Sequence, residues 1–250
     1  MTWDYYIKLM WLIGSRYLLF AGIAFLLAYV LFNRRINTKK IQSRFPKAAD
    51  YKREIGYSII TIAILALFPF VLLRNDAIRP HTTFYKDISQ YGWTYFVLAL
   101  PIMILMHDTY FYWAHRLMHH PKVFRFVHLI HHKSTNPSPW AAYSFHPLEA
   151  IIEGGIIVVF LFTIPVHSIH LFLFILFMII YNVYGHLGWE IFPKGFSRHW
   201  LGKWMNTSVN HNQHHQHFKG NYGLYFLFWD RLMGTIREDY DRHFDDVKSR

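Results

Sequence analysis

The chain has 250 residues, of which 53% are hydrophobic, 20% aromatic and only 16% charged. Soluble domains carry about 25% charged residues, so this chain has too little charge for a water-facing surface and we expect a membrane protein. The formal net charge of +11 then belongs to loops beside anionic lipid headgroups, and nucleic acid is not an expected partner. The lack of cysteine excludes disulfides, thiolate metal ligands and iron–sulfur clusters.

Three stretches in the first half are apolar enough to cross a bilayer, which takes about 20 mainly apolar residues. The first covers about 10–33, with Arg16 near its start, where a long side chain can reach the interface. The second runs from Ile55 to Leu73 and the third from Ile88 to Met106. Asp4 and the lack of a small-residue cleavage site argue against a secretory signal peptide.

A fourth apolar stretch, residues 154–189, contains no Lys, Arg, Asp or Glu and is too long for one span. Its break near Pro165 predicts a helical hairpin, and a buried or interfacial helix pair is the alternative. Residues 34–53 hold many Lys and Arg and a single acid, Asp50, which predicts a cytoplasmic loop. Two more crossings and the hairpin then bring residues 107–146 and 199–217 to the same side.

These features predict an all-α integral membrane bundle with about four membrane-spanning or re-entrant helices and a cytosolic, histidine-rich helical cap. We expect a single domain over residues 1–250. It would comprise a transmembrane region at 1–106 and a histidine-rich region at 107–237 that contains the hydrophobic hairpin at 154–187. The small size favours a bacterial inner membrane over the endoplasmic reticulum.

Histidine is the residue type that carries chemical information, with 18 in the chain. Side chains at i, i+3 and i+4 share one helix face, so a group with this spacing can direct two or three imidazoles at one point. Neutral imidazole binds iron, zinc, copper and nickel, and eight such side chains are too many for one tetrahedral zinc. One group alone could be a solvated helix face, but together they predict two metal ions. The groups are His115 with His119; His128, His131 and His132; and His211, His214 and His215.

The remaining histidines differ in what their positions indicate. His186, at the end of the last apolar stretch, is a further candidate ligand, and an interfacial side chain is the alternative. His107 is a candidate whose main alternative is a role behind the ligands, and His120 competes with His119 for one position. His146 is a candidate for shaping a substrate cavity. The others are expected to face headgroups or support ligands (His199, His217) or to be structural (His81, His167, His170, His243).

Two further residue classes stand near the histidines. Carboxylates often accept the second N–H of a ligand imidazole, although each could equally cap a helix or pair with a cation. The candidates are Asp108, Glu149, Glu153, Glu190 and Asp230. Aromatic residues could line a substrate tunnel, although for most of them we expect packing or a membrane-interface position. They are Tyr112, Trp113, Trp140, Tyr143 and Phe145.

The chain resembles the fatty acid hydroxylase superfamily in YWAHRLMHH, HLIHH, NPSPWAAYSFHPLEA and HNQHHQHFKGNYGLYFLFWDRLMGT, across about 107–237. That superfamily includes sterol desaturases, sterol C4-methyl oxidases and sphingolipid hydroxylases. The resemblance implies a helical membrane anchor, a cytosolic histidine cap, a non-haem di-iron centre and O2-dependent oxidation of lipid C–H bonds. The family's further ligand between the HxxHH motifs falls on His186, and Asn182 stands where some relatives have another histidine. A longer first spacing in other relatives would select His120 over His119.

The sequence therefore predicts a di-iron oxidoreductase that uses O2 to hydroxylate or desaturate a C–H bond of a sterol, fatty acyl or sphingolipid-like membrane lipid. Electrons would come from a separate cytochrome b5-, ferredoxin- or rubredoxin-like protein, since no cytochrome b5 segment is fused. The alternatives are a membrane zinc-dependent hydrolase or a non-catalytic metal-binding protein, and zinc could also occupy the purified protein. The expected ligands are His115, His119, His128, His131, His132, His186, His211, His214 and His215, with His107 and His120 as further candidates.

Overall fold

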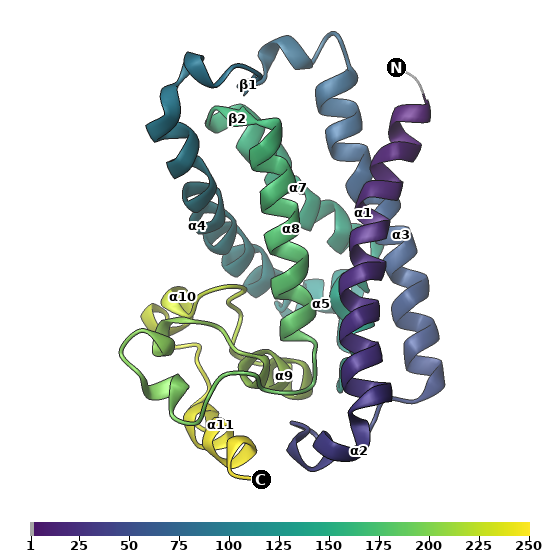
Figure 1. Cartoon of the computed structure of the whole chain (residues 1–250), viewed down its shortest axis with the longest axis vertical. Helices are drawn as coiled ribbons and strands as arrows, with labels where there is room; N and C mark the ends of the chain where they lie inside the picture. The colour runs from purple at the N-terminus through teal and green to yellow at the C-terminus, as the bar shows by residue number, and fades with distance from the viewer. Residues whose placement is uncertain (1–2) are drawn as a thin grey trace.

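The computed structural model describes residues 3–250, apart from the side chain of Arg34, and forms a tall helical bundle with a broader cap at one end (Figure 1). Lipid offers no hydrogen-bond partners, so apolar spans satisfy their backbone groups within helices. Four helices are long and apolar enough to cross a membrane, which confirms the predicted all-α membrane fold. They are α1 (Trp3–Phe25, continued by a π-helical segment, Leu26–Leu31), α3 (Ala48–Arg74), α4 (Gly92–Met118) and α8 (Ser168–Gly185).

The predicted hydrophobic hairpin consists of α7 (Pro147–Thr163) and α8, with strand β2 (Val166–His167) between them. β2 pairs in parallel with β1 (Phe84–Tyr85), in the register Phe84 to Val166. This short pairing joins the hairpin to the α3–α4 connection at the end of the bundle opposite the cap (Figure 1). The hairpin therefore returns the chain to the cap end, as its two-helix pattern predicts.

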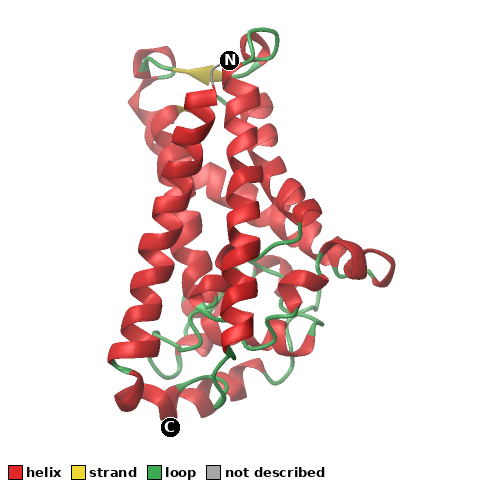
Figure 2. Cartoon of the chain, turned by 90° about the vertical axis from the view of Figure 1, so that its right-hand side faces the viewer, coloured by secondary structure: helices red, strands yellow, loops and turns green. Residues whose placement is uncertain are grey.

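The cap is assembled from short helices below the long ones, and Figure 2 shows it at the C-terminal end of the bundle. The short helices are α2 (Asn33–Ile36), α5 (Pro121–Val127), α6 (Leu129–His132), α9 (Ser208–His217), α10 (Phe228–Leu232) and α11 (Tyr240–Lys248). Single 3-10 turns lie at Asn37–Lys39, Arg79–His81, Ile88–Gln90, Pro139–Tyr143, Phe196–Arg198 and Gly202–Trp204.

Helix α4 is longer than the apolar stretch that predicts it. It starts at Gly92 and continues without a break past Met106 to Met118, about three further turns. One face of this extension is buried, including His107 and His115, so packing prolongs the helix beyond its apolar sequence. The extension carries the first histidines directly from the membrane bundle into the cap.

Arg16 lies halfway along α1 because that helix already begins at Trp3. Its side chain is only 8% exposed, and its Nη1 donates a hydrogen bond to the carbonyl oxygen of Phe172 on α8, 3.3 Å away. The guanidinium also stands 4.0 Å from the centroid of the Phe172 ring. The expectation that Arg16 reaches the membrane interface is therefore wrong, since the side chain turns into the bundle.

The basic segment 34–53 lies at the same end of the bundle as the cap (Figure 1). Some of its basic side chains form hydrogen bonds with the protein and do not face lipid headgroups. Lys40 is fully buried and its Nζ donates to Oδ1 of Asn136, 2.9 Å away. Nη2 of Arg53 donates to Oγ of Ser134 at 3.1 Å. These contacts fasten the α1–α3 connection to the segment that follows α6.

Candidate metal centre

Nine histidines converge in two adjacent groups inside the cap. Within each group the ring nitrogens lie within 4.8 Å of one another, close enough for each group to hold a metal ion. The first group is His115, His119, His128, His132 and His214, and the second is His131, His186, His211 and His215. These are the nine ligands expected from the sequence. Neither His107 nor His120 belongs to a group.

Each HxxHH motif contributes to both groups. In α6 and again in α9, the first and last histidines, four residues apart, join one group and the middle histidine joins the other. Adjacent residues are separated by about 100° around a helix, so the neighbouring pairs His131–His132 and His214–His215 point in different directions. Two imidazoles of each motif therefore meet at one point, within the expected two or three, and the third joins the other group. The segments 128–132 and 211–215 thus each supply ligands to both groups.

Backbone carbonyl oxygens determine which ring nitrogen of these histidines carries the proton. A carbonyl oxygen only accepts hydrogen bonds, so an Nδ1 beside it must donate, and a neutral imidazole then has an unprotonated Nε2. Five imidazoles are held in this way and direct Nε2 into the groups. The Nδ1 contacts are His115 to Tyr222 (2.8 Å), His131 to Ser144 (3.3 Å), His186 to Asn182 (2.7 Å), His214 to Gly220 (2.8 Å) and His215 to Ser134 (3.0 Å).

The Nε2 atoms approach one another too closely for hydrogen bonds alone to satisfy them. His211 Nε2 lies 3.1 Å from Nε2 of both His186 and His215. His186 and His215 hold their protons on Nδ1, so a single Nε2 proton on His211 can satisfy only one of the two. In the first group, Nε2 of His115 and Nε2 of His128 are 3.0 Å apart. Such converging lone pairs fit a cation held between them.

Burial and mutual proximity keep the imidazoles neutral. The pKa of His132 is lowered well below its usual value, first by burial and then by the neighbouring histidines. Both ring nitrogens of His132 are buried without a hydrogen-bond partner. Burial lowers the pKa of His186 to about 4. The cluster is therefore in the metal-binding form at neutral pH.

Glu149 on α7 is the carboxylate that touches a histidine of the groups. Its Oε1 lies 2.7 Å from Nδ1 of His128, and both side chains are almost completely buried. A carboxylate at this position favours a proton on Nδ1 and leaves Nε2 of His128 free to face His115. Of the five carboxylates considered from the sequence, Glu149 alone makes this kind of contact among the described residues.

Three other candidate carboxylates position backbone instead. Asp108 and Asp230 fix the loop around residues 222–226, whose Tyr222 carbonyl holds His115, and Glu190 binds the beginning of α9. These carboxylates thus act on the ligands through the chain. Asp108 accepts hydrogen bonds from the backbone N–H groups of Tyr225 (2.8 Å) and Phe226 (3.0 Å). Asp230 accepts from those of Tyr222 (2.9 Å) and Gly223 (2.7 Å), and Glu190 from that of Val209 (3.1 Å).

Three of the histidines outside the groups begin helices. The imidazoles of His120, His146 and His167 each accept a backbone N–H two residues later, at the starts of α5, α7 and α8. His120 is exposed and His146 half-buried. The expectation that His146 shapes a cavity is therefore not met, because its ring serves as a helix cap. His199 and His217 are exposed, as a headgroup-facing position predicts.

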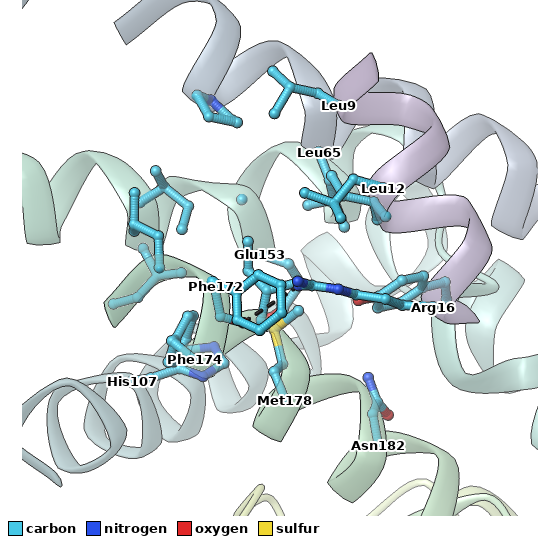
Figure 3. Close-up of a pocket in the computed structure, with 18 of the residues that line it drawn as sticks. Leu9, Leu12, Arg16, Leu65, His107, Glu153, Phe172, Phe174, Met178 and Asn182 are labelled. Carbon is cyan, nitrogen blue, oxygen red and sulfur yellow. Dashed lines mark hydrogen bonds between the residues drawn. The ribbon is translucent and has the colours of Figure 1, made fainter. Parts of the chain in front are cut away.

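A cavity of about 280 Å³ lies between the long helices (Figure 3), and two of its lining residues contact the histidine groups. Phe145 and Phe111 line it at the cap end. The Phe145 ring is 5.1 Å from that of His131, and the Phe111 ring is 4.9 Å from that of His115. Of the five aromatics considered from the sequence, only Phe145 and Tyr143 line this cavity.

The lining of the cavity is mostly apolar, with a few polar side chains that sequence reasoning did not assign to it. Figure 3 shows Arg16 reaching from α1 towards Phe172, with His107 beside Phe174 at the other side. Glu153 and Asn182 also line it. Asn182 directs its Nδ2 to the Ala142 carbonyl oxygen at 2.8 Å, so its amide is partly engaged by protein.

A family model described as fatty acid hydroxylase matches residues 100–235. The chain is 33% identical over 210 residues to a Delta(7)-sterol 5(6)-desaturase of Gibberella zeae, covering 84% of this chain and 62% of that protein. It is 30% identical over 241 residues to a Delta(7)-sterol 5(6)-desaturase of Aspergillus fumigatus, covering 89% and 72%. It is 29% identical over 189 residues to lathosterol oxidase of Homo sapiens, covering 74% and 61%.

The chain thus spans less than two thirds of the length of two of these relatives. No solved structure matches it. The relatives come from fungi and a mammal, so they lend no support to the preference for a bacterial inner membrane.

Proposed function

This chain belongs to the fatty acid hydroxylase family, and we propose that it is a membrane oxidoreductase that uses two iron ions and O2 to oxidise a C–H bond of a sterol-like lipid. The observation that carries the proposal is the pair of buried histidine groups at one end of an apolar cavity. The names of the relatives favour a sterol over the fatty acyl and sphingolipid-like alternatives, and desaturation over hydroxylation.

The five histidines of the first group would hold one iron ion and the four of the second would hold the other. When bound, iron supplies the redox chemistry that breaking an unactivated C–H bond requires and that side chains lack. The protein's part is positioning. Backbone carbonyls keep the protons of five imidazoles on Nδ1, and Glu149 lies against Nδ1 of His128. The unprotonated Nε2 atoms then face the ions without reorganisation.

The cavity would hold the lipid with its reacting carbon near Phe111 and Phe145, the lining residues next to the histidine groups. Their rings exclude water from the space between the lipid and the imidazoles. Exclusion of water protects reactive species from side reactions. The exposed apolar side chains of the long helices, such as Trp11, Leu18 and Ile59, would let a lipid approach from the bilayer.

We further propose that the cap faces the cytoplasm and receives electrons there from a separate protein. The basic segment 34–53 supports this orientation because it lies at the cap end of the bundle and positive loops remain in the cytoplasm. The histidine groups are then reached from the aqueous side by an electron carrier and from the bilayer by the lipid.

Metal analysis combined with an oxidation assay tests the proposal. Protein purified without added metal should contain one iron ion for each histidine group and should oxidise a Δ7-sterol when O2 and a reductant are supplied. His214→Asn removes a ligand of the first group and His215→Asn one of the second, so each should lower iron content and abolish turnover. His120→Asn is the matched control: it follows His119 directly, lies outside both groups and should keep both properties. Full turnover in His214→Asn, or no sterol oxidation by the iron-loaded wild type, would refute the proposal.

A further inference from the structure

Two polar side chains face the cavity without protein partners that account for them. His107 is 1% exposed, its Nδ1 lies 2.9 Å from the Tyr225 hydroxyl, and its Nε2 is buried with no hydrogen-bond partner. Glu153 on α7 lines the same cavity, and within the described residues no hydrogen bond or cation engages its carboxylate. Buried polar groups are normally paired, because an unpaired one costs free energy. Both side chains therefore indicate a ligand with polar character at this point.

His107 stands two helical turns from the first histidine group. His107, Phe111 and His115 follow one another at intervals of four residues on α4 and so share one face. The ring centroids of His107 and Phe111 are 6.1 Å apart, and those of Phe111 and His115 are 4.9 Å apart. Eight residues of α-helix span about 12 Å. A ligand atom held by His107 therefore lies at a fixed distance, about two helical turns, from the first histidine group.

We propose that His107 and Glu153 bind the hydroxyl group of a neutral lipid alcohol and thereby determine which of its carbons reaches the histidine groups. This inference rests on the proposed function of the histidine groups, because it takes the cavity as the substrate site. A hydroxyl can donate to the Glu153 carboxylate and also pair with Nε2 of His107. The lipid hydroxyl can pair with Nε2 in either tautomer of His107, because a hydroxyl both donates and accepts. The Tyr225 hydroxyl likewise suits Nδ1 in either tautomer, since it can donate to Nδ1 or accept from it.

Other ligand chemistries fit these two side chains less well. A purely hydrocarbon ligand would leave His107 and Glu153 unpaired in an apolar cavity. An anionic group would add a second negative charge beside Glu153 whenever that carboxyl group is ionised. One cation, Arg16, lines the described cavity, and its guanidinium is held against α8 by the carbonyl oxygen and the ring of Phe172. Its Nη2 is free, so an anionic sterol ester is a necessary comparison in the test.

The experiment measures equilibrium binding to the metal-loaded full chain in lipid nanodiscs, without reductant. The probes are a Δ7-sterol, the same sterol without its hydroxyl, its methyl ether and its sulfate ester. Wild type should bind the alcohol about ten-fold or more tighter than the hydroxyl-free sterol, because only the alcohol gives the two unpaired side chains a hydrogen-bond partner. The methyl ether accepts hydrogen bonds but cannot donate one, so its affinity should lie between those of the alcohol and the hydroxyl-free sterol.

In His107→Leu and in Glu153→Leu the preference for the alcohol should fall to about two-fold or less, while binding of the hydroxyl-free sterol persists. Tyr225→Phe keeps the imidazole but removes its hydroxyl partner, and should lose part of the preference. His243→Gln on α11, which does not line the cavity, should keep all of it. Unchanged metal content serves as the folding check for each variant, and Tyr225→Phe replaces any leucine variant that fails it.

An undiminished preference for the alcohol in the folded variants overturns the proposal. Tighter binding of the sulfate ester than of the alcohol also overturns it, and assigns the cavity to an anionic lipid through Arg16. Binding is measured without turnover, so an absence of oxidation chemistry would leave the alcohol preference intact and would count against the proposed function alone. If folded His107→Leu oxidises the same carbon as wild type with the same selectivity, the second half of the proposal fails.

Discussion

Glu149→Gln removes a negative charge beside a histidine of the first group while keeping the size of the side chain. Glu149 Oε1 lies 2.7 Å from His128 Nδ1, and the two side chains are 1% and 2% exposed, so water cannot replace the contact. Loss of such an outer partner typically weakens metal binding by about 10–100-fold, which corresponds to about 1.4–2.7 kcal/mol. We expect the first group to lose affinity by this factor. The second group should be unaffected, because none of its four histidines contacts Glu149.

A chelator titration of the iron-loaded protein measures this difference. In Glu149→Gln, one of the two ions should be withdrawn at a chelator concentration about 10–100-fold lower than in wild type, and the other at an unchanged concentration. Glu153→Gln is the matched control for metal affinity, since it makes the same change one helical turn later on α7 and outside both groups. Unchanged affinity for both ions, or equal loss of both, would refute the idea that Glu149 holds His128 in place.

Three further outcomes follow from local geometry. A Cβ at position 154 would collide with the Phe68 ring, so Gly154→Ala should reduce the free energy of unfolding by about 1–3 kcal/mol and lower the thermal midpoint. A Cβ at position 56 meets nothing within 4 Å, so Gly56→Ala should not lower the midpoint. Metal-free protein should lose stability as pH falls from about 6.5 towards 4. In this range His186 takes up a proton in the unfolded chain but not in the folded protein, where burial lowers its pKa to about 4. A melting temperature that does not change with pH over this range would contradict this. Asp230→Ala frees two backbone N–H groups of the loop behind the first histidine group, and elemental analysis should show a lower iron content.

Eight of the nine histidines could be predicted because helical spacing is a local property, and His186 was predicted from its place at the end of the last apolar stretch and from the family resemblance. The decision between His119 and His120 was also accessible in principle. His120 and His146 each precede a proline that begins a helix, and the residue before such a proline is a natural cap. A histidine–proline pair at a helix start therefore indicates a cap and argues against a ligand.

The polar side chains of the cavity could not be assigned from the sequence. Whether Arg16 meets lipid or the bundle interior depends on where α1 begins and how it is rotated against α8, and both are set by packing. His107 looked like a candidate ligand because it shares a helix face with His115. Two turns of helix separate them, and that distance leaves His107 in the cavity.

Helix α9 has no apolar face with which to hold its position. Residues 208–215 of this helix are all buried, although the sequence SVNHNQHH contains a single aliphatic residue, Val209. Side-chain atoms of Asn210, Asn212 and Gln213 are buried without hydrogen-bond partners. Apolar burial therefore contributes little to the docking of α9, and on the proposed function metal ligation by its three histidines would be the main stabilising interaction.

Removal of iron should consequently loosen α9 before it affects the membrane helices. After chelation, amide hydrogen exchange should accelerate in residues 208–217 and in α6, which supplies ligands to the same two groups. Exchange in α1 and α3, which pack on each other through apolar side chains, should change little. Equal acceleration along the whole chain would show that iron stabilises the entire fold. No change in α9 would mean that its buried polar contacts suffice without metal, and the argument from its composition would be wrong.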